Sequence, residues 1–276
     1  MKTKKFSILP WLMRLVLWTA CGLTVLPILF VFNSSISTTT SLFSSTLLPQ
    51  SITVQNYINL FTETDFLGWL RTTLITSIGG SLLGLVLTLT MGYAFSRFQF
   101  PGRRYGLLVL IMVQMIPSAV MIVAIYRILL WLDLLNNNMG LILVYSGITI
   151  PVNSWLMRGY FNSISREIEE AAYIDGATRF GAFLRIALPL ASPMIAVVFI
   201  FNLISFYNDY LFASIVMLGR NHYTVSLGLR FFNAPYAANW SMFAAASIVA
   251  CLPIAIIFYA LQRYLVEGLT KGAMKG

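Results

Sequence analysis

The chain has 276 residues, of which 58% are hydrophobic and only 10% charged, and its mean hydropathy is +0.81. This composition lies outside the range of soluble globular domains. A net charge of +9 can indicate nucleic-acid binding, but here the basic residues are scattered at the ends of apolar segments, as membrane topology requires. We therefore predict an all-α transmembrane protein that contacts membrane lipid and no nucleic acid.

Six long apolar segments predict six transmembrane helices. All six lack charged side chains, and all but the first exceed the roughly 20 residues that a helix needs to cross the hydrocarbon core. In chain order the segments are 15–32, 72–96, 105–126, 134–157, 186–208 and 231–262.

The first segment has the alternative interpretation of a cleavable signal peptide, because Lys2, Lys4 and Lys5 precede it. Arg14 interrupts the apolar stretch, however, and residues 31–35 offer no A-x-A cleavage site. We therefore expect a retained first helix.

The basic residues also predict the orientation of the chain. If the N-terminus is cytoplasmic, the internal segments carry 14 of the 18 Lys and Arg residues. The external segments then carry Arg71, Arg127, Arg220 and Arg230. This bias follows the positive-inside rule, and six spans return the C-terminus to the cytoplasm.

Small residues recur every four positions along the second segment, which places them on one side of a helix. They are Thr76, Gly80, Gly84, Thr88 and Gly92. Such a stripe lets two helix backbones approach closely. We favour a static contact over a helix that slides against its partner.

Three prolines, Pro27, Pro117 and Pro253, fall inside predicted spans. Proline removes a helical hydrogen bond and clashes with the preceding turn, so each is expected to kink its helix. Kinked helices can line cavities, although they are also common in membrane bundles generally.

A polar segment lies between the fourth and fifth spans and carries four acids and three arginines within residues 166–185. So many charges must lie outside the hydrocarbon core. A serine followed by acids predicts a helix start. The pair Asp175-Gly176 predicts its end, because glycine readily adopts the left-handed conformation of a C-terminal cap. A second short helix is expected over residues 177–186.

An ordinary amphipathic helix on the membrane surface would have a similar pattern. The polar face of this segment is acidic as well as basic, however, which suits anionic headgroups poorly. Ala171 and Ala172, with the turn at Gly176, also provide a small-residue surface. These features favour docking onto another protein.

The spacing of seven residues in this segment resembles the E-A-A loop of the permease subunits of bacterial ABC importers. These residues are Glu170, Ala171, Ala172, Gly176, Ile186, Leu188 and Pro189. In that family the loop forms a coupling helix that sits in a cleft of the cytoplasmic ATPase. The resemblance therefore implies that these residues, together with Asp175, couple the chain to an ATPase.

The stretches 222–230, 239–246 and 265–276 are similar to the smaller permease of the maltose/maltodextrin transporters and their oligosaccharide relatives. The resemblance implies the six-helix bundle of a type I importer permease. It divides the chain into a first helix with an external segment (1–68), a permease core (69–265) whose coupling loop covers about 158–189, and a cytoplasmic tail (266–276).

The same resemblance implies the partners. They are a second homologous permease, two cytoplasmic ATPase subunits that hold ATP and Mg²⁺, an external sugar-binding protein and an oligosaccharide. The substrate would be a malto-oligosaccharide or another short glucan or galactan, imported across a bacterial inner membrane.

No G-x-x-x-x-G-K-[S/T] phosphate loop occurs in the chain, so we expect a transport subunit without its own ATPase site, bound cofactor or enzymatic activity. Carboxylates within the spans are scarce, and Asp209 near the outer end of the fifth is the one candidate. The alternative function is therefore an ion-coupled secondary transporter that uses Asp209.

Polar residues of the third and fifth spans are candidates to line a translocation path. They are Gln114, Asn202, Tyr207, Asn208 and Asp209. Hydrogen bonding between helices is the alternative role for Gln114 and Asn202. Aromatic rings beside hydrogen-bonding groups suit sugars, which favours a path role for residues 207–210. In maltose-type transporters, however, the larger permease carries the principal sugar site.

The third external segment contains Asn233, Ala234, Pro235 and Tyr236. A static turn would have a similar sequence. In the maltose-type family the corresponding loop enters the cleft of the binding protein and helps to displace the sugar. The resemblance therefore implies an external release loop here.

Overall fold

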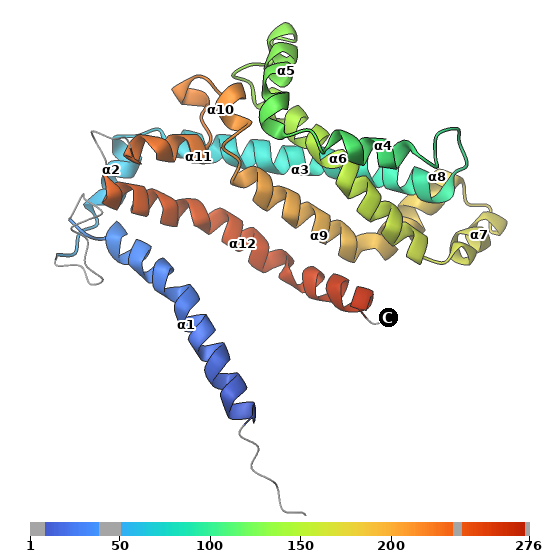
Figure 1. The fold of residues 1–276 in the computed structure, drawn as a ribbon, viewed down its shortest axis with the longest axis horizontal. Coiled ribbons are helices and arrows are strands. Elements are labelled where there is room, and N and C mark those ends of the chain that lie inside the picture. Colours follow the sequence, from blue (N-terminus) through green and yellow to red (C-terminus); the bar gives the residue numbers. More distant parts are fainter. Residues whose placement is uncertain (1–8, 39–50, 234–238, 274–276) are drawn as a thin grey trace, which may run out of the picture. The chain divides into compact units, whose positions relative to one another are not determined.

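The computed structural model of the protein describes residues 9–38, 51–233 and 239–273, and every named element in these ranges is a helix (Figure 1). The α-helices are α1 (Leu9–Ser35), α2 (Gln55–Thr62), α3 (Phe66–Arg97), α4 (Gly106–Val113), α5 (Ser118–Trp131), α6 (Asn138–Ser163), α7 (Arg166–Ile174), α8 (Arg179–Ala182), α9 (Leu188–Tyr207), α10 (Ala213–Val216), α11 (Val225–Gly228) and α12 (Trp240–Ala273). Shorter π- and 3-10-helical turns are η2 (Phe183–Ala187), η3 (Arg220–His222) and η4 (Leu229–Asn233). The all-α prediction is confirmed.

The chain divides into two compact units. One comprises Met1–Phe66 with Leu229–Cys251, and the other comprises Leu67–Gly228 with Leu252–Gly276. The candidate functional residues that the structure describes lie mainly in the second unit.

Five helices are long and apolar enough to cross a membrane, and they correspond to five of the six predicted spans. They are Pro10–Ser35, Phe66–Arg97, Asn138–Ser163, Arg179–Tyr207 and Trp240–Gln262. The third predicted span is instead broken into α4 and α5.

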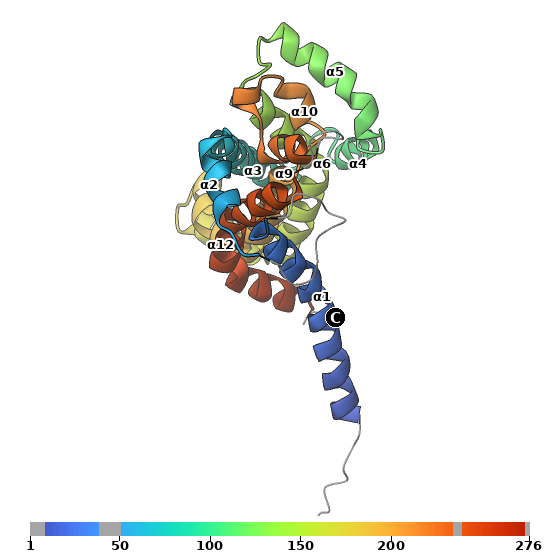
Figure 2. The same ribbon diagram turned by 90° about the vertical axis from the view of Figure 1, so that its left-hand side faces the viewer.

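The break between α4 and α5 is larger than the kink that the sequence predicts. The two helices are bent by 96°, and Pro117 at the start of α5 has the extended backbone angles φ −55° and ψ 131°. Proline has no N–H to donate, and it disfavours helical angles in the residue before it. The result is two helices at nearly a right angle, and α5 extends away from α3 and α9 in both views (Figures 1 and 2).

In the first unit, the start of α2 is hydrogen-bonded to the end of α1. The hydroxyls of Ser35 and Tyr57 lie 2.7 Å apart, and the side-chain amide of Asn56 donates to the carbonyls of Ser35 and Ser37. Residues of α1 itself are exposed along the apolar window of the helix. An apolar helix of this kind is covered by lipid or by another helix.

In the second unit, two apolar clusters hold the helices together. One joins α5, α6, α9 and α10 around Tyr145 and Phe206, whose rings stack with centroids 4.4 Å apart. The other joins α3, α6, η2 and α9 around Tyr93 and Phe183, whose centroids lie 4.6 Å apart. Helices α6 and α9 contribute to both clusters and therefore form the centre of this unit.

The small-residue stripe of α3 packs closely against α6. A Cβ atom added at Gly80 would lie 2.7 Å from the Cβ of Tyr145, and one added at Gly92 would lie 2.8 Å from the Cβ of Met157. Real Cβ atoms do not approach each other so closely, so only glycine fits at these positions. The predicted tight contact is confirmed.

Gly92→Ala is expected to lower the stability of the folded protein, because the added Cβ also lies 3.1 Å from the backbone nitrogen of Arg158 and the two helices must separate. Overpacking of this kind typically costs about 1–3 kcal/mol. Gly159→Ala is the matched control, since a Cβ at this helical glycine meets nothing within 4 Å. Thermal unfolding in detergent measures the difference, and equal midpoints would contradict the close contact.

Candidate functional site

The predicted docking segment is a helix–turn–helix in the structure. Helix α7 begins after Ser165, whose hydroxyl accepts a hydrogen bond from the N–H of Glu167 at 3.3 Å. It ends before Gly176, which has the left-handed φ of +88°. The next helix begins after Thr178, which accepts from the N–H of Gly181 at 3.0 Å. The expected helix start and glycine turn are confirmed.

The second helix of the segment differs from the expectation, because it does not end before the fifth span. Helix α8, η2 and α9 form one continuous helix over Arg179–Tyr207. The N–H of Leu188 donates to the carbonyl of Phe183, five residues earlier, in a π-helical turn. Pro189 follows directly after this turn, and proline inside a membrane helix is tolerated where a local π-helical adjustment compensates for its missing N–H. The predicted motif residues Ile186, Leu188 and Pro189 therefore lie at a π-helical junction within a span.

Most of the predicted coupling residues are accessible on the surface of the chain. Glu170, Ala171, Asp175 and Gly176 are exposed, and Ala172 is half-buried. This surface can contact another protein without unfolding the segment.

The sequence analysis missed two exposed apolar side chains beside these residues. Ile174 is 87% exposed and Phe180 is 67% exposed. Large exposed apolar side chains often mark a contact surface. Their position on either side of the Asp175-Gly176 turn was the signal that could have identified them.

The sequence analysis also missed the burial of Glu169, which is only 2% exposed. Its carboxylate forms an ion pair of 2.8 Å with Arg97 at the end of α3. It also accepts a hydrogen bond of 2.7 Å from the hydroxyl of Tyr93. The ion-pair partners are 72 residues apart in the sequence, so no local pattern reveals them.

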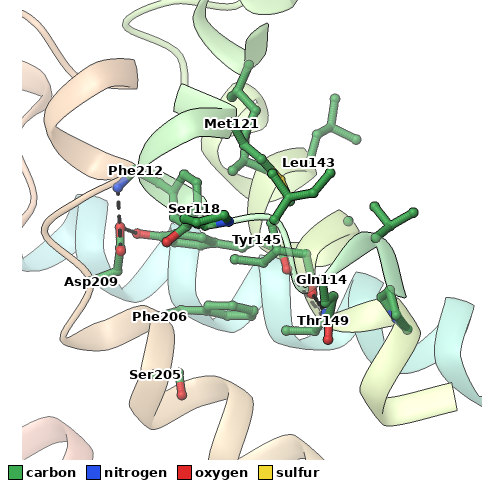
Figure 3. Close-up of a pocket in the computed structure, with 18 residues that line it drawn as sticks. Gln114, Ser118, Met121, Leu143, Tyr145, Thr149, Ser205, Phe206, Asp209 and Phe212 are labelled. Atoms are coloured by element: carbon green, nitrogen blue, oxygen red, sulfur yellow. Dashed lines mark hydrogen bonds between the residues drawn. The ribbon is translucent and has the colours of Figure 1, made fainter. Parts of the chain in front are cut away.

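A cavity of about 740 Å³ lies where the break between α4 and α5 faces α6 and the end of α9 (Figure 3). Its hydrogen-bonding side chains are Gln114, Ser118, Tyr145, Thr149, Ser205 and Asp209. The remaining lining residues are apolar or glycine, and they include the stacked ring of Phe206. A few polar groups among apolar and aromatic walls are typical of small-molecule sites.

Asp209 is held in the cavity wall by hydrogen bonds from the chain itself (Figure 3). One oxygen, Oδ2, accepts from the hydroxyl of Tyr145 and from the N–H of Ala213, both at 3.0 Å. The other, Oδ1, accepts from the N–H of Phe212 at 3.5 Å. The carboxylate thereby joins α6 to the turn between α9 and α10. On the opposite wall, the side-chain amide of Gln114 donates to the carbonyl of Ile148.

Comparison with protein families identifies the fold. Residues 80–271 match the family described as "Binding-protein-dependent transport system inner membrane component". The chain belongs to this family. It is therefore a multi-pass permease of the bacterial inner membrane, a transport subunit and not the ATPase itself.

Two curated relatives of this permease are transport proteins of Bacillus subtilis. The maltodextrin transport system permease protein MdxG is 36% identical, and the alignment covers 82% of this chain and 82% of that protein. The galactooligosaccharides transport system permease protein GanQ is 35% identical, with 91% and 90% covered. Among solved structures, a chain of a bacterial ABC transporter that imports the acidic polysaccharide alginate has the same fold. Its TM-score is 0.80 at 22% identity, with 96% of this chain and 99% of that chain covered.

The other predicted path residues of the permease do not line the cavity. Asn202 is buried and accepts a hydrogen bond of 2.9 Å from Asn153. Tyr207 is buried, and its carbonyl accepts from the hydroxyl of Ser226. Asn208 is exposed and donates to the carbonyl of Ile204 at 2.8 Å. Only Gln114 and Asp209 of the five candidates meet in one cavity.

The predicted release loop of the permease falls largely outside the described residues. Asn233 ends η4, and Ala234, Pro235 and Tyr236 belong to the part of the chain that the structure leaves undescribed. At the C-terminus, α12 continues to Ala273, so the expected tail begins as part of this helix.

Proposed function

We propose that this permease imports neutral oligosaccharides of the maltodextrin type, as one of two permeases around a central path. Two ATPase subunits on the cytoplasmic side, which bind ATP and Mg²⁺, would drive the cycle. An external sugar-binding protein would deliver the substrate, and residues 233–236 would help to release it. The names of the relatives MdxG and GanQ, which refer to maltodextrins and galacto-oligosaccharides, support an oligosaccharide substrate.

The residues that line the cavity support a neutral sugar as the substrate. Accessible apolar side chains such as Ile116 and Leu143, with the short polar side chains of Ser118, Thr149 and Ser205 beside them, suit the apolar faces and hydroxyls of a sugar. The eighteen described lining residues include no Lys or Arg, and Asp209 is among them. An anionic sugar such as alginate would meet a carboxylate and no compensating cation, so a neutral sugar fits better.

Uptake competition tests this substrate class. In the complete transporter, unlabelled maltodextrin is expected to suppress uptake of labelled maltotetraose, because both occupy the same neutral site. An alginate oligosaccharide of equal length is expected to compete about 100-fold less well, owing to repulsion by Asp209 and the lack of cationic partners. Equal competition by the two sugars would contradict the proposal.

The exposed surface of α7 supports the proposed coupling to an ATPase. Glu170 is accessible, and its carboxylate forms no hydrogen bond or ion pair with the described residues, so it can pair with a basic group of a partner. The bias of Lys and Arg favours a cytoplasmic position for this segment. The neighbouring apolar side chains Ile174 and Phe180 would add buried area to the contact.

Glu170→Ala is expected to weaken retention of the ATPase subunits, because truncating one partner of a buried charge pair typically costs about 2–5 kcal/mol. Co-purification of the ATPase with tagged permease measures this effect, and membrane insertion is expected to be normal. Glu167→Ala is the matched control, since Glu167 is an exposed acid on the same helix. Wild-type retention and uptake in Glu170→Ala would reject the coupling role.

Ion-coupled transport through Asp209 is the alternative mechanism. The contacts of Asp209 with Tyr145 and with two backbone N–H groups supply a structural reason for a carboxylate at this position. Membership of the binding-protein-dependent family also favours an ATP-driven cycle. Replacing Asp209 by Asn distinguishes the two mechanisms, because Asn keeps a hydrogen-bond acceptor but not the charge.

A further inference from the structure

Helix α7 carries two neighbouring acids that have opposite surroundings. Glu169 is 2% exposed, whereas Glu170 is exposed to solvent. Successive residues of a helix point about 100° apart, so one side of α7 can face the permease while the next faces outward. The proposed function assigns the outward side of α7 to the contact with the ATPase. The buried Glu169 therefore has no role in that contact.

Every oxygen of the Glu169 carboxylate has a partner on α3. Oε1 accepts from Nε of Arg97 at 2.8 Å and lies 2.8 Å from Nη2 of the same guanidinium. Oε2 accepts from the hydroxyl of Tyr93 at 2.7 Å. The Arg97 side chain is itself only 7% exposed, and its Nη2 also donates to the carbonyl of Ile164 at 3.1 Å. The three side chains form a buried cluster between the last turn of α3 and the middle of α7.

The position of α7 depends on such contacts. A helix of nine residues has little stability of its own, so its orientation is set by what it packs against. A second bond reinforces the cluster, since Nη2 of Arg166 donates to the carbonyl of Ser96 at 3.0 Å. Helix α7 is thus fixed to the end of α3, opposite the end at which α3 lies near α11 (Figure 1).

Helix α3 in turn contacts the cavity wall through its glycine stripe. Gly80 lies directly against Tyr145, and Tyr145 donates its hydroxyl proton to Asp209 in the cavity. The interface between α3 and α6 has no room to compress at Gly80 or Gly92. If α7 is displaced, the cluster would move α3 with it. Because the interface between α3 and α6 cannot compress at these glycines, α6 and the cavity wall would then move as well.

We propose that Glu169 is a positioning residue that transmits movement of α7 to α3 through Arg97 and Tyr93. This inference rests on the proposed function, in which α7 docks onto an ATPase. Separating the cluster would leave an uncompensated buried charge, so α7 and the end of α3 move together. Glu170 then serves the contact with the partner, and Glu169 serves the transfer of its movement.

The test uses the complete transporter, reconstituted with its ATPases and binding protein, and measures sugar uptake per ATP hydrolysed. Glu169→Gln is expected to lower this ratio about tenfold, while ATPase retention stays within about twofold of wild type. Glu169→Asp, which keeps the charge, is expected to recover part of the loss. The matched control is Glu167→Gln, an exposed acid on the same helix, for which the ratio is expected to be unchanged.

Two results would overturn the inference. One is a ratio for Glu169→Gln equal to that of Glu167→Gln. The other is loss of the ATPase subunits from Glu169→Gln, which would make Glu169 a docking residue. If Glu169→Gln does not accumulate in the membrane, the Tyr93→Phe variant tests the inference in its place, because it removes only one hydroxyl. Its ratio is expected to fall about threefold, and an unchanged ratio would reject the link. A wild-type permease that retains no ATPase would refute the proposed function instead, independently of Glu169.

Discussion

Asp209→Ala is expected to reduce uptake about tenfold and to lower the unfolding temperature of the permease. The change leaves the Tyr145 hydroxyl and the N–H groups of Ala213 and Phe212 without the acceptor that they have now. An unsatisfied buried donor typically costs about 1–3 kcal/mol, so the turn after α9 and the cavity wall should both be disturbed. Uptake of labelled maltotetraose and thermal unfolding in detergent measure the two effects.

Asp209→Asn is expected to retain uptake within about threefold of wild type. A single amide oxygen has two lone pairs and can accept from both Tyr145 and Ala213, as Oδ2 does now. An ion-coupled carrier would respond differently, because it needs the charge of the carboxylate. If the Asn variant were as inactive as the Ala variant while inserting and folding normally, the ion-coupled alternative would be favoured.

Gly176→Val is expected to lower uptake about tenfold or more without preventing membrane insertion. The φ of Gly176 is +88°, and a Cβ there would meet nothing within 4 Å, so the effect would arise from the backbone and not from a clash. Left-handed geometry costs L-residues roughly 1–2 kcal/mol, and β-branched residues are true outliers there. The substitution should therefore redirect α7 relative to α8.

Graded variants at the same position provide the control. Gly176→Asn is expected to retain the most uptake, because asparagine adopts left-handed angles more readily than other residues, and Gly176→Ala should be intermediate. The amount of permease in the membrane is measured by immunoblot in each case. Near-normal uptake in both the Val and Ala variants would mean that the geometry of this turn does not matter for coupling.

Features with a local cause could be predicted from the sequence. Hydropathy over about 20 residues identifies spans, because a helix in lipid must satisfy its own backbone. The start of α7 after Ser165 and its end at Gly176 follow from capping rules that involve only a few neighbouring residues. The four-residue spacing of small residues predicted the tight packing of α3, although not the identity of its partner.

Features that depend on distant contacts could not be predicted. The pairing of Arg97 with Glu169 requires knowing that α3 and α7 meet, and the helix pattern alone does not distinguish Glu169 from Glu170. The size of the bend at Pro117 depends on how α5 packs against α6 and α10, so the sequence predicted a kink and not a 96° break. For a similar reason, the sequence could not show which of the five polar path candidates line the cavity. Only Gln114 and Asp209 of the five face the space beside this bend.

The break between α4 and α5 also determines what kind of hydrogen-bonding groups the cavity offers. The ends of two helices meet in its wall, at residues 113–118. The N–H groups of Gln114, Met115 and Ile116 donate to carbonyls three residues earlier, and Pro117 has no N–H, so the main chain offers the wall chiefly carbonyl groups. Non-helical backbone at membrane depth is stable only inside protein or against water, and this backbone borders a cavity in which water can hydrogen-bond to its carbonyls. Part of the polarity of the cavity is then a property of the main chain. Changing the side chains at the break should therefore alter the shape of the cavity strongly. It should have much less effect on the hydrogen bonds that the backbone groups of the wall can form with water or with sugar hydroxyls.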